Sequence, residues 1–192
     1  MGKIIWMFCI GFCSSLYSQD VSVGERKMLA KFTGSLYKAN LLNTKTEHSY
    51  IGGNLEFFLH DKYSVRGDVY SLIGETNTVG YSTRGTVQMG VGLNRNFTRK
   101  RCSPFVGIYT GGSRMVLNSL TQTFAPDLTR PKIQFVPIVG FHLGIQYFVS
   151  KNFHFFVEAR YVHQLHPFST KLIDEISYSG GLGFQISTKK KK

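Results

Sequence analysis

Apolar and polar side chains alternate over several long stretches of this chain. In "FHFFVEARYVH", which begins at Phe153, the odd-numbered positions as far as Tyr161 are apolar, whereas the intervening positions include Glu158 and Arg160. A repeat of two residues is typical of a β-strand, in which successive side chains point to opposite faces. The stretches "IGGNLEFFL" and "IQFVPIVGFHLGIQYFV" show the same repeat. Each therefore predicts a strand with one apolar face and one polar face.

The pattern predicts eight such strands and an all-β fold. Several are long enough for the roughly 9–11 residues that a tilted strand needs to cross a membrane. Tight connections such as "LHDKY" and "VSKNF" alternate with longer, more polar ones. This plan predicts an eight-stranded antiparallel up-and-down transmembrane β-barrel with short periplasmic turns and longer extracellular loops. The expected strands cover about residues 27–37, 49–59, 63–73, 83–97, 104–117, 132–149, 153–166 and 175–187.

One residue fits this plan poorly. Pro137 lies inside the predicted strand 132–149, and proline has no N–H to donate to a strand ladder. A closed barrel has no free edge on which to place it, so we expect a bulge or bend there.

The N-terminus predicts export. "MGKIIWMFCIGFCSSLYSQD" has one lysine, an apolar run from Ile4 to Phe12, and then small and polar residues, which is the layout of a secretory signal peptide. The expected organisation is a signal peptide at 1–18, a short lead at 19–26, the barrel at 27–187 and a basic tail at 188–192. Cleavage would leave Cys102 as the only cysteine, which excludes an internal disulfide framework.

Positive charge is concentrated at one end of the predicted barrel. The chain has a formal net charge of +12, and much of the excess falls at the predicted periplasmic end, including Lys62, Arg101 and Lys151. We expect these basic residues to form a solvated rim near lipid headgroups. A more specific hypothesis is electrostatic contact with anionic phospholipid or cell-wall polymer. No nucleic acid partner is expected, because an exported chain does not meet it.

The phrases "GNLEFFLHDKYSVRGDVY" and "FHFFVEARYVH" resemble the small eight-stranded outer-membrane β-barrels of the OmpA/OmpX type, in particular the Bacteroidetes-like outer membrane protein β-barrel domain. The resemblance covers residues 27–187 and implies a monomer in the outer membrane of a Gram-negative bacterium, in contact with phospholipid and lipopolysaccharide. "SGGLGFQI" looks like the C-terminal insertion signal that the barrel assembly machinery reads. The expected signal residues are Ser179, Gly181, Phe184 and Ile186.

Charged residues are expected inside the barrel. Arg66-Gly67-Asp68 is a tripeptide that elsewhere can act as a cell-adhesion signal, but strand parity directs Arg66 and Asp68 to the polar face. An eight-stranded barrel is just wide enough for side chains to fill, and charges buried there must pair. A structural plug is therefore expected in place of a wide diffusion pore. The predicted interior network is Lys31, Glu56, Arg66, Asp68, Glu158 and Arg160.

Two alternatives remain open. For a lipid A-modifying enzyme, "EARYVHQLHPFS" offers Glu158, His163, His166 and Ser169. However, Glu158 and His163 fall on opposite faces of a strand, so an oriented base is hard to assemble. No catalytic, cofactor-binding or metal-binding residue is therefore predicted. A soluble lipocalin-like ligand-binding barrel would reverse the faces, with apolar side chains inside and charges outside. The expected function is an integral outer-membrane barrel with a structural or surface-interaction role.

Overall fold

A computed structural model describes residues 26–42, 46–60, 62–76, 81–82, 85–97, 101–119, 132–150, 152–164 and 173–189. The predicted signal peptide lies outside these residues, as does nearly all of the predicted lead. The described ranges contain no helix that is long and apolar enough to cross a membrane. Their elements are β1 (Arg26–Leu41), β2 (Glu47–His60), β3 (Tyr63–Thr76), β4 (Tyr81–Ser82), β5 (Val87–Asn96), β6 (Cys102–Ser119), β7 (Lys132–Phe148), β8 (Phe153–Gln164) and β9 (Ile173–Lys189).

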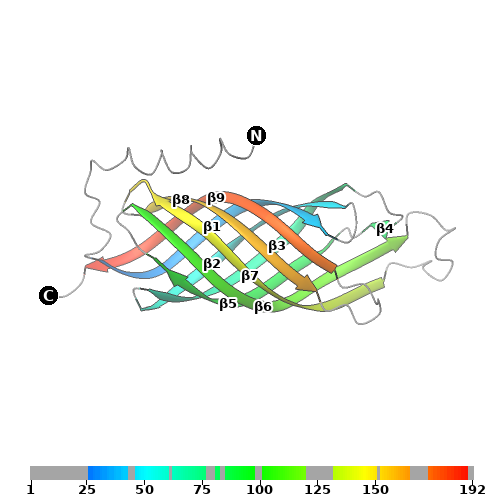
Figure 1. Cartoon of the computed structure of the whole chain (residues 1–192), viewed down its shortest axis with the longest axis horizontal. Helices are drawn as coiled ribbons and strands as arrows, with labels where there is room; N and C mark the ends of the chain where they lie inside the picture. The colour runs from blue at the N-terminus through cyan, green and yellow to red at the C-terminus, as the bar shows by residue number, and fades with distance from the viewer. Residues whose placement is uncertain are drawn as a thin grey trace.

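Eight of these strands form a closed antiparallel barrel (Figure 1). Their order around the wall is β1-β2-β3-β5-β6-β7-β8-β9, and β9 pairs with β1 to close the ring. β4 pairs only with the last residues of β6, so it extends the wall and is not a ninth member of the ring. The predicted eight-stranded up-and-down fold is confirmed. β1 begins and β9 ends at the same end of the barrel, which we call the terminal end, and the opposite end is the distal end.

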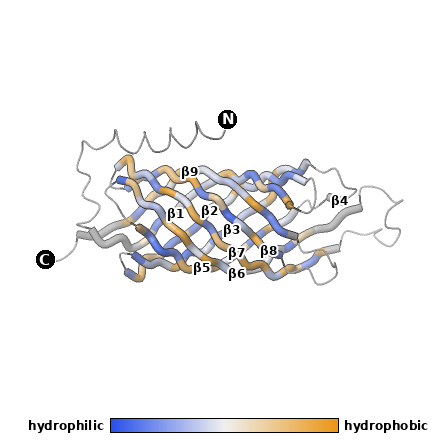
Figure 2. Tube along the Cα trace, in the orientation of Figure 1, coloured by the Kyte–Doolittle hydropathy of each residue, from blue (hydrophilic) through white to orange (hydrophobic). Residues whose placement is uncertain are grey.

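The period-two pattern decides which side chains point outward. Along β8, every second residue from His154 to Gln164 is buried, while Phe155 and Val157 between them are 53% and 68% exposed. Large exposed apolar side chains occur on each of the eight long strands, and apolar and polar positions alternate along the wall (Figure 2). Hydrocarbon is the solvent that such a wall requires. This distribution is the reverse of the one expected for a soluble lipocalin-like barrel.

Some strand boundaries differ from the prediction. β5 begins at Val87, not near residue 83. The reason is that Gly85 adopts a φ of 78°, a left-handed turn conformation that glycine allows and that interrupts a strand. β9 runs to Lys189 and pairs Lys189 with Arg26. The last strand therefore includes the first two residues of the predicted basic tail.

The bulge expected at Pro137 is absent. The β6–β7 ladder passes through the pair Gly112 and Pro137 without a register shift. On the other side, the β7–β8 ladder begins one residue later, with Ile138 opposite Gln164. Proline is tolerated because one edge of β7 has no described partner strand at that position.

Candidate functional site

Arg66 from β3 is buried inside the barrel. Its Nη1 and Nη2 atoms donate to the two carboxylate oxygens of Glu158 at 2.5 and 3.1 Å, and its Nε donates to Asp68 Oδ1 at 2.8 Å. Glu158 lies on β8, which is not a neighbour of β3 in the sheet, so this bidentate pair crosses the interior. All three residues are at most 5% exposed. The interior is therefore bridged at this level by an ion pair with the geometry that makes such pairs strong.

Two tyrosines complete this cluster. The hydroxyl of Tyr70 donates to Asp68 and accepts from Arg66 Nη2 at 3.2 Å. The hydroxyl of Tyr37 lies 2.9 Å from that of Tyr70, and the two rings meet edge to face at 4.5 Å. These contacts supply the hydrogen bonds that ionised groups need when they leave bulk water.

A second ion pair lies on β1 and β2. Lys31 and Glu56 are opposite each other in the ladder, form a salt bridge, and are 2% and 0% exposed. The hydroxyl of Ser64 also donates to Glu56, and Asn96 Nδ2 donates to the same carboxylate oxygen at 3.2 Å. One ammonium and two neutral donors therefore hold this buried carboxylate.

Arg160 is stabilised differently from the other five predicted network residues. Its Nε donates to the Tyr109 hydroxyl at 2.6 Å and its Nη2 donates to Gln88 Oε1 at 2.7 Å. Its guanidinium carbon lies 4.4 and 4.6 Å from the ring centroids of Tyr70 and Tyr109. Two aromatic faces and two neutral acceptors therefore surround this charge, in a cation–π arrangement.

Sequence reasoning missed several polar members of the interior. On the distal side of the cluster, the Tyr50 hydroxyl contacts Glu175 Oε2 at 3.2 Å, and Gln88 Nε2 donates to the same oxygen at 3.4 Å. The signal available in the sequence was parity, because Tyr37, Tyr50 and Gln88 all fall on the inward face of their strands. Parity does not tell which inward side chains meet, since that depends on how the barrel closes.

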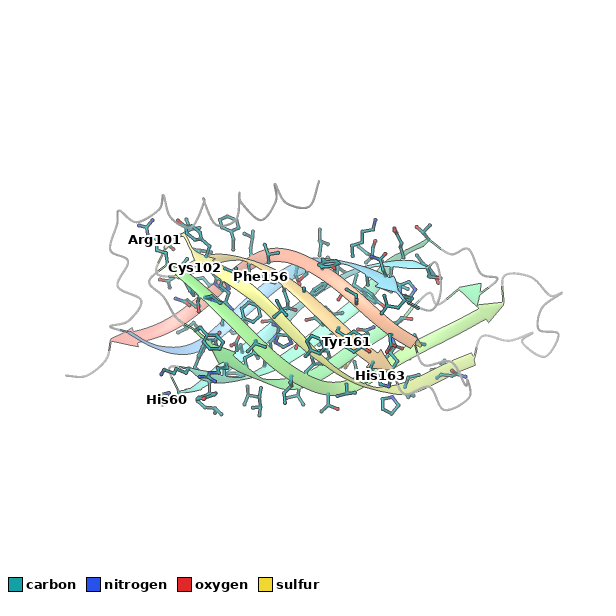
Figure 3. All side chains as sticks on the ribbon, in the orientation of Figure 1. His60, Arg101, Cys102, Phe156, Tyr161 and His163 are labelled. Atoms are coloured by element: carbon teal, nitrogen blue, oxygen red, sulfur yellow. The ribbon has the colours of Figure 1, made fainter. Side chains whose placement is uncertain are left out.

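A polar cluster also lies on the outer wall. Asp174 Oδ1 accepts from the Tyr161 hydroxyl at 2.9 Å and lies 2.7 Å from His163 Nδ1. His163 and Glu158 are on opposite faces of β8, as predicted, so Asp174, and not Glu158, orients this imidazole. Tyr161 and His163 are labelled in Figure 3, toward the distal end. His166 and Ser169 lie outside the described residues, within which no group of three or more His, Cys, Asp or Glu residues could hold a metal ion.

The structure also places the Arg66-Gly67-Asp68 tripeptide and the residues of the predicted insertion signal. Arg66 and Asp68 are buried, so the Arg66-Gly67-Asp68 tripeptide is not displayed to a partner. Phe184 and Ile186 point outward with 38% and 44% exposure, whereas Ser179 is 6% exposed on the inner face. Gly181 shares that inner face. The predicted insertion signal thus alternates between inner and outer faces within β9.

No protein-family model matches the chain, and no curated protein matches it in sequence. Solved structures match it in fold. Neisserial surface protein A has a TM-score of 0.61 and 14% identity, covering 82% of this chain and 96% of that protein. The outer membrane protein OprG from Pseudomonas aeruginosa has a TM-score of 0.59 and 13% identity, with coverages of 85% and 98%.

The N-terminal β-barrel domain of Pseudomonas aeruginosa OprF has a TM-score of 0.55 and 13% identity, covering 83% of this chain and 100% of that domain. Identities this low establish a shared fold and not a shared activity. The closed ring, its outward apolar wall and these similarities agree on one architecture. The fold of this chain is that of the small eight-stranded outer-membrane β-barrels of the OmpA/OmpX type.

Proposed function

We propose that this protein is an integral outer-membrane β-barrel with a closed, salt-bridged interior and a structural or surface-interaction role, without catalysis. One observation carries the proposal: large apolar side chains cover the outer wall, and a network of ionisable side chains is buried inside it, namely Lys31, Glu56, Arg66, Asp68, Glu158 and Arg160. Only a nonpolar solvent outside makes this arrangement stable, because water would favour the reverse.

The interior argues against a wide diffusion pore. Arg66 and Glu158 join strands that are not neighbours, so their side chains occupy the lumen. Opening a continuous path there would break a hydrogen-bonded ion pair and leave its charges without partners. The narrow lumen of an eight-stranded barrel is filled by side chains in the same way. A structural plug is the role that these contacts support.

The same proposal covers location and partners. We place the protein in the outer membrane of a Gram-negative bacterium, exported by its predicted signal peptide and inserted by the barrel assembly machinery. Its lipid contacts would be phospholipid and lipopolysaccharide, it would act as a monomer, and no nucleic acid or cofactor would take part. Similarity to solved outer-membrane barrels, one of them described as a surface protein, supports this placement.

Membrane fractionation and electrophoresis test the proposal. The protein should remain in the membrane fraction after carbonate extraction, and unheated samples should migrate differently from boiled ones, because a closed barrel resists unfolding by detergent. In planar bilayers the purified protein should give no wide-pore conductance. Extraction by carbonate, with no shift between heated and unheated samples, would overturn membrane integration. Large stable conductance steps would overturn the closed interior.

A further inference from the structure

The outer wall has a hollow near its terminal end. It spans β8, β9 and β1, has a volume of about 480 Å³, and is lined almost entirely by apolar atoms. Three phenylalanines from three strands line it in one row, because Phe32, Phe184 and Phe153 are opposite one another in the ladders. Gly34, Leu182 and Phe155 form the next row in the same way. Strand register therefore determines which side chains surround the hollow.

Gly34 leaves the space open. A Cβ atom built at this position would meet no heavy atom within 4 Å. Among the described glycines a positive φ is found at Gly85, so the backbone does not require glycine at position 34. The neighbouring outward side chains are large: Phe32 is 48% exposed and Leu182 is 60% exposed. Missing side-chain volume among large neighbours produces a concave apolar surface.

We propose that this hollow binds one acyl chain of a phospholipid from the membrane leaflet at the terminal end. The proposal rests on the membrane placement above, which exposes this wall to hydrocarbon. A flexible acyl chain can follow a concave surface and fill it, whereas a second barrel presents a convex wall that cannot. The T-shaped contact of Phe153 with Phe184, at 5.3 Å between ring centroids, gives the hollow a rigid aromatic side.

Packing alone would supply the preference for this position. Exchange of one acyl chain for another involves no transfer from water, so the gain comes from van der Waals contacts that a flat wall does not offer. We expect a several-fold preference over bulk lipid, where each tenfold step corresponds to about 1.4 kcal/mol.

Fluorescence quenching tests the site in the full chain. Its single tryptophan, Trp6, is replaced by Trp6→Phe, and Phe153→Trp places a probe at the hollow. A matched probe is Phe57→Trp on β2, where the native side chain is 52% exposed to the same surroundings. The proteins are reconstituted in bilayers that contain a small fraction of phospholipid with brominated acyl chains. As the fraction of brominated phospholipid increases, quenching at the Phe153→Trp probe should rise several-fold more steeply than at the Phe57→Trp probe and then saturate.

Filling the hollow provides the control. Gly34→Leu should reduce the quenching of the Phe153→Trp probe to that of the Phe57→Trp probe. Gly67→Leu should have no effect, since position 67 also has room for a Cβ atom, whose nearest neighbour would be 3.9 Å away, but lies on β3. Both variants are checked for folding by heat-modifiability.

The outcomes separate this inference from the proposed function. Equal quenching at both probes would overturn the acyl-chain site while leaving the barrel in the membrane. Weaker quenching at Phe153→Trp, together with cross-linked dimers, would show that a second copy covers the hollow and would also overturn it. Absence of quenching at both probes would overturn the membrane placement itself.

Discussion

Removing Arg66 is expected to destabilise the barrel strongly. Arg66→Met keeps the length and apolar stem of the side chain but deletes its hydrogen bonds to Glu158, Asp68 and Tyr70. Glu158 and Asp68 then remain buried, at 1% and 5% exposure, without the cation that bridged them. Breaking a buried ion pair by removing one partner costs about 3–5 kcal/mol, and this is the expected loss in the free energy of unfolding.

An exposed ion pair on the same barrel gives the matched control. Lys38 and Glu47 are 2.9 Å apart, but their side chains are 65% and 48% exposed. Such pairs contribute about 0–1 kcal/mol, so Lys38→Met should change stability little. The two variants remove the same formal charge, which leaves burial as the difference between them.

The assay is urea unfolding of each variant in the same detergent, with the folded fraction read from unheated gel samples. The double variant Arg66→Met with Glu158→Gln should recover part of the loss, because one uncompensated charge is also removed. If Arg66→Met were no more damaging than Lys38→Met, water must solvate the two carboxylates, and the account of a dry, closed interior would be refuted.

Two further outcomes are expected in the same unfolding assay. Gly181→Ala should destabilise the barrel by about 1–3 kcal/mol or more, because the added Cβ would lie 2.0 Å from the Gly34 carbonyl oxygen. The outward-facing Gly180→Ala should be tolerated, because its Cβ would lie 3.7 Å from its nearest neighbour, the Phe156 carbonyl oxygen. Equal stability of the two variants would contradict the close approach of the strands at Gly181. Asp174→Asn should cost about 0.5–1.5 kcal/mol, because the hydrogen bond from Tyr161 loses a charged acceptor; an unchanged unfolding midpoint would show that the outer-wall cluster does not form in the folded protein.

The sequence by itself determined the inner and outer faces. A strand repeats every two residues, so a single inward residue sets the direction of all others along it. The alternation in "FHFFVEARYVH" therefore sufficed to place Glu158 inside and Phe155 outside, as the exposures show. The predicted strand ends differ from those of the structure, because they depend on single turn residues such as Gly85, whose backbone conformation a hydropathy pattern does not show.

Only the tertiary structure decided which side chains meet. Arg66 bridges to Glu158 because closure brings β3 and β8 to opposite sides of a narrow lumen, a relation that no local spacing encodes. Arg160 lies between two tyrosine rings, and Asp174 orients His163 through the register of β8 and β9. The reason is physical. The face on which a side chain lies depends on one strand alone, whereas the side chains that it contacts depend on the tilt and register of all eight strands together.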